Sequence, residues 1–323
     1  MYSYIDMHCD TLLRTLSGDS SLLYENDGMQ SLRQMQEARQ MCQFFAIFFR
    51  PGSGEENLQM LSDEEYFRIL RANLYHEVEI HKDFIAMAYN YDDIISNWKN
   101  GLMSAVLTIE DGRMVEGSME RLAFLYEQGV RAIALTWNYE NCFGYPNSKN
   151  QDVMSMGLKD FGKEAIEEMN RLGMLIDVSH LSDGGFYDVA SLSKKPFIAS
   201  HSNCRELTAH QRTLTDDMIR ILAEHGGVAG INLSPDFISR SADLTKSRVD
   251  DLAAHVLHFI RIGGEDCVGI GTDFDGIEGE FEIEHPTQMS LLFDALEKKG
   301  VTPRQLDKLA NGNVLRVMKE TMR

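Results

Sequence analysis

The chain has 323 residues, of which 43% are hydrophobic and 25% are charged, a composition typical of a globular protein with a sizeable core. Its formal net charge is −19, so long-range repulsion argues against nucleic acid and an anionic membrane surface as partners. No apolar run approaches the roughly 18 residues that a membrane span needs.

The cysteines and the N-terminus indicate the cellular compartment. The five cysteines are widely spaced, odd in number and without a C-x-x-C motif, which is typical of reduced thiols rather than of a disulfide framework. The first residues lead into an apolar segment without the features of a secretion signal. We therefore expect a cytoplasmic protein. Because no linker or low-complexity tract divides the chain, we expect a single domain over residues 1–323.

Apolar runs alternate with amphipathic stretches along the whole chain. The runs predict eight buried strands near residues 4–10, 42–49, 103–110, 130–137, 174–180, 196–201, 227–233 and 267–272, with a minor strand at 84–89. Helical spacing is present at 32–39, 62–80, 92–99, 118–128, 160–172, 183–192, 215–225, 250–261, 288–299 and 303–319. Ser62 is placed to cap the second of these helices, and Gly129 and Gly173 are placed to end two others.

Eight near-continuous apolar strands separated by helices predict an α/β protein whose parallel sheet closes as a (β/α)8 TIM barrel. The alternative is a doubly wound open sheet, which usually has fewer strands. A dinucleotide-binding sheet of that kind carries a glycine-rich fingerprint after its first strand, whereas this chain has Asp6-Met7-His8-Cys9-Asp10 there. The closed barrel is therefore the favoured fold.

Polar side chains fall where five of the predicted strands end. These residues are His8, Asp10, Glu110, His180, His201 and Asp273. A His-x-Asp pair alone carries little weight, since about one or two His-x-acid pairs are expected by chance at this composition. The C-terminal ends of barrel strands, however, are where such folds build their active sites. Six such residues on one face therefore predict a metal centre.

The residue types indicate which metal. Three histidines, one aspartate and one glutamate offer nitrogen and oxygen ligands without a thiolate, which suits a hydrolytic Zn²⁺ centre with open positions. Five protein ligands exceed the three that are typical of one catalytic zinc. Two metal ions about 3.5–4 Å apart, bridged by a carboxylate, would use all five, and a water between them could ionise near pH 7. We therefore expect two Zn²⁺ per chain.

These motifs resemble those of the membrane (renal-type) dipeptidases, which are binuclear zinc peptidases on a (β/α)8 barrel of the metallo-dependent hydrolase type. The resemblance covers most of the chain and rests on five segments in the same order. They are Ile5–Asp10, Leu107–Gly112, Leu175–His180, Ser200–Ser202 and Gly271–Gly276. The resemblance implies that His8 and Asp10 hold one zinc. His180 and His201 would then hold the other, with Glu110 as the bridge.

The resemblance also assigns residues to the substrate. Arg212 matches the arginine that grips the free carboxylate of the substrate, and an acidic protein needs one local guanidinium for that group. Asp273 matches the catalytic acid, which would take a proton from the attacking water, pass it to the leaving amine and meet the α-ammonium group of the substrate. We interpret Asp275 as structural and Asp177 as a buried, hydrogen-bonded group.

The chain departs from the family at the end of the fourth barrel strand. Many members have a histidine after Leu-Thr that helps to stabilise the oxyanion, whereas here Trp137 and Asn138 follow Leu135-Thr136. We expect Asn138 to supply part of that electrophilic help as a substrate-binding donor. The signal peptide, lipid-anchor signal and disulfide of the mammalian members are not recognisable here, so the chain is similar to a bacterial-type cytoplasmic relative.

The sequence therefore predicts a zinc-dependent dipeptidase that cleaves dipeptides with a free C-terminal carboxylate through a metal-bridging hydroxide, with Glu110 and Asp273 as catalytic residues. One alternative is another amidohydrolase-like hydrolase, such as a deaminase or lactonase. His-x-Asp rather than His-x-His in the first strand, and a glutamate rather than a lysine as the bridge, argue against it. A non-enzymatic binding barrel is the other alternative, and its mark would be a missing ligand. A homodimer is implied by the resemblance alone.

Overall fold

The barrel predicted from the sequence is present. The structure, a computed structural model, describes residues 2–17, 23–49, 61–239 and 245–322. Its main sheet closes on itself in the order β1-β2-β4-β5-β6-β7-β8-β10, and all neighbouring strands are parallel. The barrel strands are β1 (Ile5–Cys9), β2 (Cys42–Phe48), β4 (Met103–Glu110), β5 (Val130–Ala134), β6 (Leu175–Asp177), β7 (Ile198–Ala199), β8 (Val228–Ile231) and β10 (Val268–Ile270). The minor strand β3 (Ile85–Met87) pairs with the first residues of β4.

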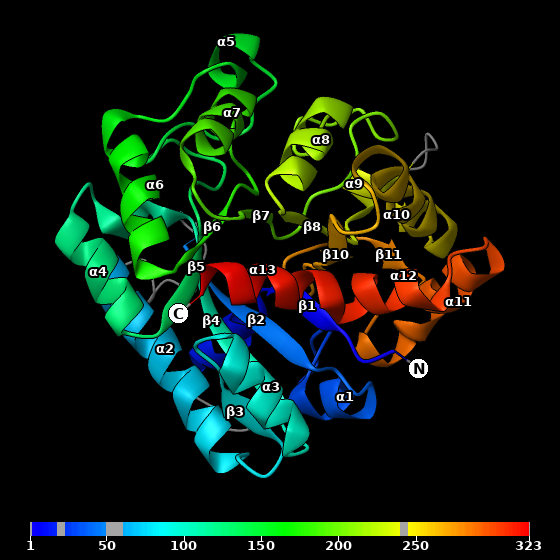
Figure 1. Cartoon of the computed structure of the whole chain (residues 1–323). Coiled ribbons are helices and arrows are strands. Elements are labelled where there is room, and N and C mark those ends of the chain that lie inside the picture. The colour runs from blue at the N-terminus through cyan, green and yellow to red at the C-terminus, as the bar shows by residue number, and fades with distance from the viewer. Residues whose placement is uncertain (1, 18–22, 50–60, 240–244, 323) are drawn as a thin grey trace.

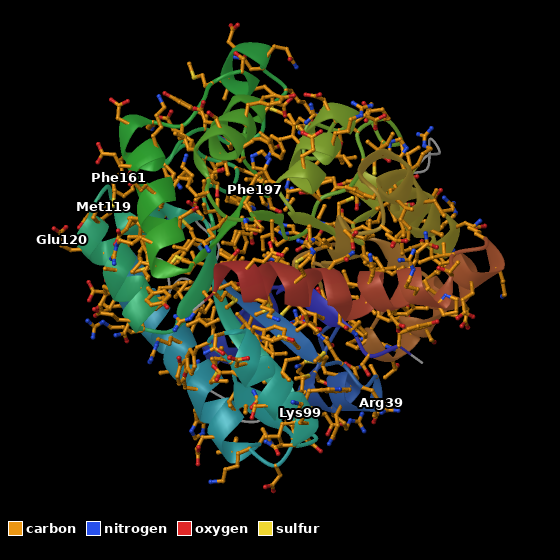
Figure 2. The ribbon with its side chains drawn as sticks, in the orientation of Figure 1. Arg39, Lys99, Met119, Glu120, Phe161 and Phe197 are labelled. Atoms are coloured by element: carbon orange, nitrogen blue, oxygen red, sulfur yellow. The ribbon has the colours of Figure 1, made fainter. Side chains whose placement is uncertain are left out.

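Helices surround this barrel (Figure 1). They are α1 (Leu32–Glu37), α2 (Asp63–Ile80), α3 (Tyr91–Lys99), α4 (Met119–Glu127), α6 (Asp160–Leu172), α7 (Asp183–Leu192), α8 (Asp216–Glu224), α10 (Val249–Gly263), α11 (Ser290–Lys298), α12 (Pro303–Asp307) and α13 (Asn313–Thr321). Their apolar side chains form one buried cluster with those of the barrel strands. Met119 of α4 and Phe161 of α6 lie partly buried against this cluster, toward the outer edge of the molecule (Figure 2). None of the helices in the described residues combines the length and apolar character needed to cross a membrane.

Shorter segments lie in the connections. They are η1 (Thr11–Ser17), η3 (Gly112–Val115), α5 (Gln151–Met154), α9 (Pro235–Ile238), β9 (Lys246–Ser247), β11 (Glu280–Phe281), η4 (Pro286–Gln288) and η5 (Lys308–Gly312). Ser62 caps α2 in a reciprocal capping box with Glu65, as predicted. The predicted helix at 303–319 is divided, because the π-helical turn η5 separates α12 from α13.

The helix α13 closes the N-terminal end of the barrel. Figure 1 shows it lying across the strands. Val314, Val317 and Met318 are buried in one apolar cluster with the first residues of several strands, among them Ile5 of β1 and Ile198 of β7. Since this end is plugged by side chains, a site can open only at the opposite end, where the strands terminate.

The strand β1 carries a β-bulge next to the site. Asp6 pairs with Gln43 of β2 but Cys9 pairs with Phe45, so β1 has one more residue than β2 between these pairs. Bulges of this kind re-aim side chains near active sites. His8 therefore points into the barrel, while Cys9 packs with Phe45 in the surrounding core. Cys9 is therefore a core residue and lies apart from the candidate ligands.

Several strands end earlier than predicted. β6 and β7 end at Asp177 and Ala199, so His180 and His201 lie in the loops that follow rather than on the strands. The side chain of Asp177 takes the place of a backbone hydrogen bond between strands there, because its Oδ1 accepts the backbone N–H of Ser200 at 2.9 Å. β5, β8 and β10 also stop before their predicted ends. The predicted face of the barrel is right, but only His8 and Glu110 lie on strands, and the other candidate residues are held by loops.

Candidate metal centre

The five predicted metal ligands meet at the C-terminal end of the barrel. Glu110, the last residue of β4, lies between the histidines. Its Oε1 is 2.8 Å from Nε2 of His180 and 3.6 Å from Nε2 of His201, and its Oε2 is 3.4 Å from Nε2 of His8. Oδ1 of Asp10 lies 3.9 Å from the same nitrogen. The five side chains are 0–10% exposed, so the structure holds them together in a nearly dry pocket.

Three hydrogen-bond acceptors converge in one half of this centre. Nδ1 of His201 lies 2.7 Å from Oγ of Ser200, and Nδ1 of His180 lies 3.2 Å from Oδ1 of Asn138. When each Nδ1 donates to its oxygen partner, each Nε2 carries a lone pair. The two Nε2 atoms lie 3.1 Å apart and face the carboxylate of Glu110. Acceptors that face one another without a donor are stabilised by a cation.

The other half of the centre contains buried atoms without partners. Nε2 of His8 and Oδ1 of Asp10 have no hydrogen-bond partner among the described residues, which is costly for buried polar atoms. Ligand atoms of His8, Glu110 and His201 all lie within 4.8 Å of one another, as do those of His8, Asp10 and Asp273. By donor type, burial and spacing, these residues fit metal ions.

Burial sets the protonation of the histidines. It lowers the pKa of His180 to about 4, with a further contribution from the guanidinium of Arg212, and it lowers the pKa of His201 well below its usual value. Burial also lowers the pKa of His8, but the nearby carboxylates, first that of Glu110, outweigh it and raise this pKa to about 10. His180 and His201 are thus neutral, as metal ligands must be.

Arg212 is a buried cation with free donors. It lies in the segment between β7 and α8, and it is 5% exposed. Nη1 donates to Oγ of Ser202 at 3.0 Å, whereas Nε and Nη2 have no hydrogen-bond partner among the described residues. Burial lowers its pKa to about 10, against the opposing influence of Asp273 and Glu110, so it remains charged at neutral pH. A buried guanidinium with unused donors can bind an anionic group.

Asp273 borders the half of the centre that contains His8 and Asp10. Its Oδ1 is 3.8 Å from Nε2 of His8, and its Oδ2 accepts from Nδ2 of Asn232 at 2.7 Å. Burial, followed by the repulsion from Glu110, raises its pKa to about 6, although His8, Arg212 and Asn232 act in the opposite direction. A carboxyl group with such a pKa can exchange a proton near neutral pH. Its φ of 63° lies in the left-handed region, a conformation that is uncommon in non-glycine residues and that clusters at functional sites.

The loop after β5 contributes an aromatic wall. The ring centroid of Trp137 lies 5.0 Å from that of Phe48 and 6.2 Å from that of His180. Asn138 is exposed, and its Oδ1 faces Nδ1 of His180. The structure therefore places the predicted substrate-binding Asn138 against a metal-ligand candidate, where it orients the imidazole.

Sequence reasoning missed most of the groups that orient the ligands, and it gave Asp177 only as a buried, hydrogen-bonded group, which is confirmed. Ser200 contacts Nδ1 of His201, and Asp177 accepts the backbone N–H of Ser200. Asn232 donates to the carboxylate of Asp273. Asp6 accepts from the backbone N–H and Oγ1–H of Thr272. A signal was present, because the dipeptide Ser-His occurs at both histidines after β6 and β7. Asp275 binds Oγ1 of Thr11 and the backbone N–H of Met29 away from the centre, which agrees with its predicted structural role.

Sequence comparisons show which known proteins the chain is similar to. The family model for membrane dipeptidases, peptidase family M19, matches residues 2–323. An uncharacterized dipeptidase, C965.12, of Schizosaccharomyces pombe is 38% identical over 234 residues, which are 71% of this chain but only 56% of that protein. The dipeptidase tcpJ of Claviceps purpurea is 26% identical over 300 residues, covering 91% of this chain and 69% of that protein.

Solved structures show the same fold. A metallo peptidase from Rhodobacter sphaeroides, liganded with a phosphinate mimic of the dipeptide L-Ala-D-Ala, has a TM-score of 0.88 at 24% identity and covers 99% of both chains. An amidohydrolase from Pseudomonas aeruginosa has a TM-score of 0.82 at 20% identity, covering 99% of this chain and 97% of the other. The match of the family model over almost the whole chain decides the assignment: the chain belongs to the membrane dipeptidase family, a family of metallopeptidases.

Proposed function

We propose that this chain is a zinc-dependent dipeptidase with two Zn²⁺ per chain, acting on dipeptides that have a free C-terminal carboxylate. The observation that carries the proposal is the convergence of Nε2 of His180, Nε2 of His201 and Oε1 of Glu110 beside a buried Arg212 with unused donors. The first feature fits a metal ion, and the second fits a carboxylate. A dipeptide presents its scissile bond one residue away from that carboxylate.

Each candidate ligand has a place in this proposal. His8 and Asp10 would hold one ion, His180 and His201 the other, and Glu110 would bridge them, in line with its contacts to both halves. When bound, two zinc ions supply Lewis-acid polarisation of the peptide carbonyl and lower the pKa of a water between them toward 7.

The remaining residues handle the substrate and the proton. Arg212 binds the terminal carboxylate through Nε and Nη2, which fixes the register of the peptide. Asp273, whose pKa is raised to about 6, accepts the proton of the attacking water and delivers it to the leaving nitrogen. Asn138 holds the imidazole of His180 through Oδ1, and its amide nitrogen is the candidate donor to the developing oxyanion.

Two other functions make different demands on the site. The buried guanidinium with two unused donors favours a substrate that carries an anionic group, which a dipeptide always has and the substrate of a deaminase or lactonase need not have. A non-enzymatic barrel would show a lost ligand, whereas all five candidates lie together. The proposal also includes a cytoplasmic location and a homodimer, which cell fractionation and light scattering of the purified protein would check.

The test combines metal analysis with a matched panel of substrates. The purified protein is expected to bind two zinc ions per chain and to hydrolyse dipeptides, with little turnover of the same dipeptides amidated at the C-terminus. Glu110→Gln keeps the size of the side chain but removes the charge, so it is expected to lower both zinc content and activity. Less than one tightly bound metal per chain, or full activity of Glu110→Gln, would contradict the proposal.

A further inference from the structure

Behind His201 lies a buried chain of hydrogen-bonded side chains to which the proposed mechanism assigns no role. Oγ of Ser200 contacts Nδ1 of His201 at 2.7 Å, and the same hydroxyl donates to Oδ2 of Asp177. The three residues are 0–4% exposed, so water does not compete with these contacts. Oδ1 of Asp177 in addition accepts the backbone N–H groups of Ser179 and Ser200, each at 2.9 Å.

The hydrogen bond from Ser200 to Asp177 sets the proton positions along this chain of side chains. A serine hydroxyl has a single proton, and here that proton is directed to the carboxylate of Asp177. The oxygen of Ser200 can then only accept from Nδ1–H of His201. An imidazole that donates from Nδ1 carries its lone pair on Nε2, and Nε2 is the atom that faces Glu110 and His180.

We propose that Asp177 and Ser200 are positioning residues that lock His201 in the tautomer that binds a metal ion. The inference rests on the proposed metal centre and extends it to residues outside the ligand set. It also predicts an asymmetry, since the ligand on the other side, His180, is oriented by the exposed amide of Asn138. Water can replace an exposed amide, but it cannot readily replace a buried hydroxyl backed by a carboxylate.

Two substitutions separate the role of Ser200 from that of Asp177. Ser200→Ala removes the acceptor at Nδ1 but leaves the backbone contacts of Asp177 in place. Asp177→Asn keeps an oxygen for those backbone donors but can turn its amide N–H toward Ser200. The hydroxyl would then donate to Nδ1 of His201 and favour the tautomer with a proton on Nε2, so this variant is expected to bind metal more weakly than Ser200→Ala.

The experiment measures zinc affinity by chelator competition, zinc content of the dialysed protein, and the melting temperature with and without zinc. Partners that orient a metal-binding histidine typically contribute 10- to 100-fold to affinity. We therefore expect Ser200→Ala to bind the zinc assigned to His180 and His201 about 10- to 100-fold less tightly and to lose much of the rise in melting temperature that zinc causes. Asn138→Ala is expected to lose less affinity.

Ser193→Ala is a matched control. Ser193 is also a buried serine, and its Oγ donates to the carbonyl of Lys195 at 2.7 Å, but it has no contact with the centre. This variant is expected to lower the melting temperature of the metal-free protein while leaving zinc affinity unchanged. A purely structural role of Ser200 would give the same pattern for Ser200→Ala and would overturn the inference. If the unaltered protein binds less than one zinc, the proposed function itself fails.

Discussion

Arg212 shows at the scale of one residue how a polar group in a dry site is matched to an expected ligand. A buried guanidinium normally donates its hydrogen bonds to carboxylates or carbonyls. Among the described residues only Nη1 of Arg212 has a hydrogen-bond partner, the hydroxyl of Ser202. The nearby carboxylates of Asp273 and Glu110 keep the guanidinium charged. Its unused donors cost desolvation free energy, which the hydrogen bonds to a bound anion would offset.

Arg212→Lys tests this reading. Lysine retains the charge but cannot form two parallel hydrogen bonds with a carboxylate. A charge-assisted hydrogen bond contributes about 1.5–3 kcal/mol, so KM for free-acid dipeptides is expected to rise about 10- to 100-fold. Zinc content should stay at the unaltered level, because Arg212 is not a ligand. Steady-state kinetics of a dipeptide and its amide measure the effect, and an unchanged preference for the free acid would contradict the role.

Asp111, next to Glu110, allows a prediction on pH. Burial raises its pKa to about 6, whereas the ordinary value is about 3.9. The folded metal-free protein therefore binds more protons than the unfolded chain between these values, and the contribution of Asp111 to stability falls as pH rises through about 6. Two pKa units correspond to about 3 kcal/mol.

Asp111→Asn removes this titration. Asparagine tolerates the positive φ of 71° at this position, and its oxygen can still accept from Asn141 and from the backbone of Arg113. In chelator-treated protein, the free energy of unfolding of the variant relative to the unaltered protein is expected to increase between pH 4 and pH 8. Urea unfolding at several pH values measures it, and a difference independent of pH would refute the assignment.

At the scale of elements, the barrel could be predicted and its loop geometry could not. The apolar run at Cys42–Phe48 and the run at Met103–Glu110 are long enough to be recognised as buried strands, and both are confirmed. β7 has only two residues, because the backbone N–H of Ser200, the next residue, donates to the side chain of Asp177 and not to a backbone carbonyl of a neighbouring strand. A pattern of apolar residues carries no information about such side-chain acceptors.

The left-handed residues escaped prediction for the same reason. His180 has a φ of 69° and Asp273 a φ of 63°, conformations that cost energy in a non-glycine residue. They are maintained by tertiary contacts such as the bond between Asp273 and Asn232. The types of the candidate ligands were readable from the sequence because strand ends are recognisable. The angles at which they enter the centre depend on residues far apart in the chain.

The helix α13 offers a prediction at this scale, because it closes the end of the barrel opposite to the metal centre. Met318 is fully buried there. Met318→Ala is expected to lower the free energy of unfolding by about 2–5 kcal/mol, the usual cost of truncating a buried side chain to alanine. Activity and zinc content at a temperature where the variant is folded should remain unchanged. Denaturant unfolding and kinetics measure the two effects, and a loss of zinc would show that the two ends are coupled.

At the scale of the whole molecule, the net charge of the protein and the charge of Arg212 in its candidate site act in opposite directions on an anionic substrate. The chain carries a net charge of −19, which repels anions at long range, whereas Arg212 attracts a carboxylate at short range. Salt screens exposed charges over a distance of about 30 Å at 0.01 M and about 10 Å at 0.1 M, and it screens buried charges much less. Salt should therefore relieve the repulsion more than it weakens the contact with Arg212.

This difference predicts how ionic strength changes substrate preference. Two dipeptides are compared that share the C-terminal residue and differ in whether the N-terminal side chain is a carboxylate or is neutral. Raising the ionic strength from about 0.01 M to about 0.3 M is expected to raise kcat/KM for the acidic dipeptide about two- to tenfold relative to the neutral one, because charge steering acts on association. The ratio cancels any common effect of salt on Arg212 or on zinc. A ratio that does not change with salt would mean that the approach to the centre is shielded from the net charge of the protein.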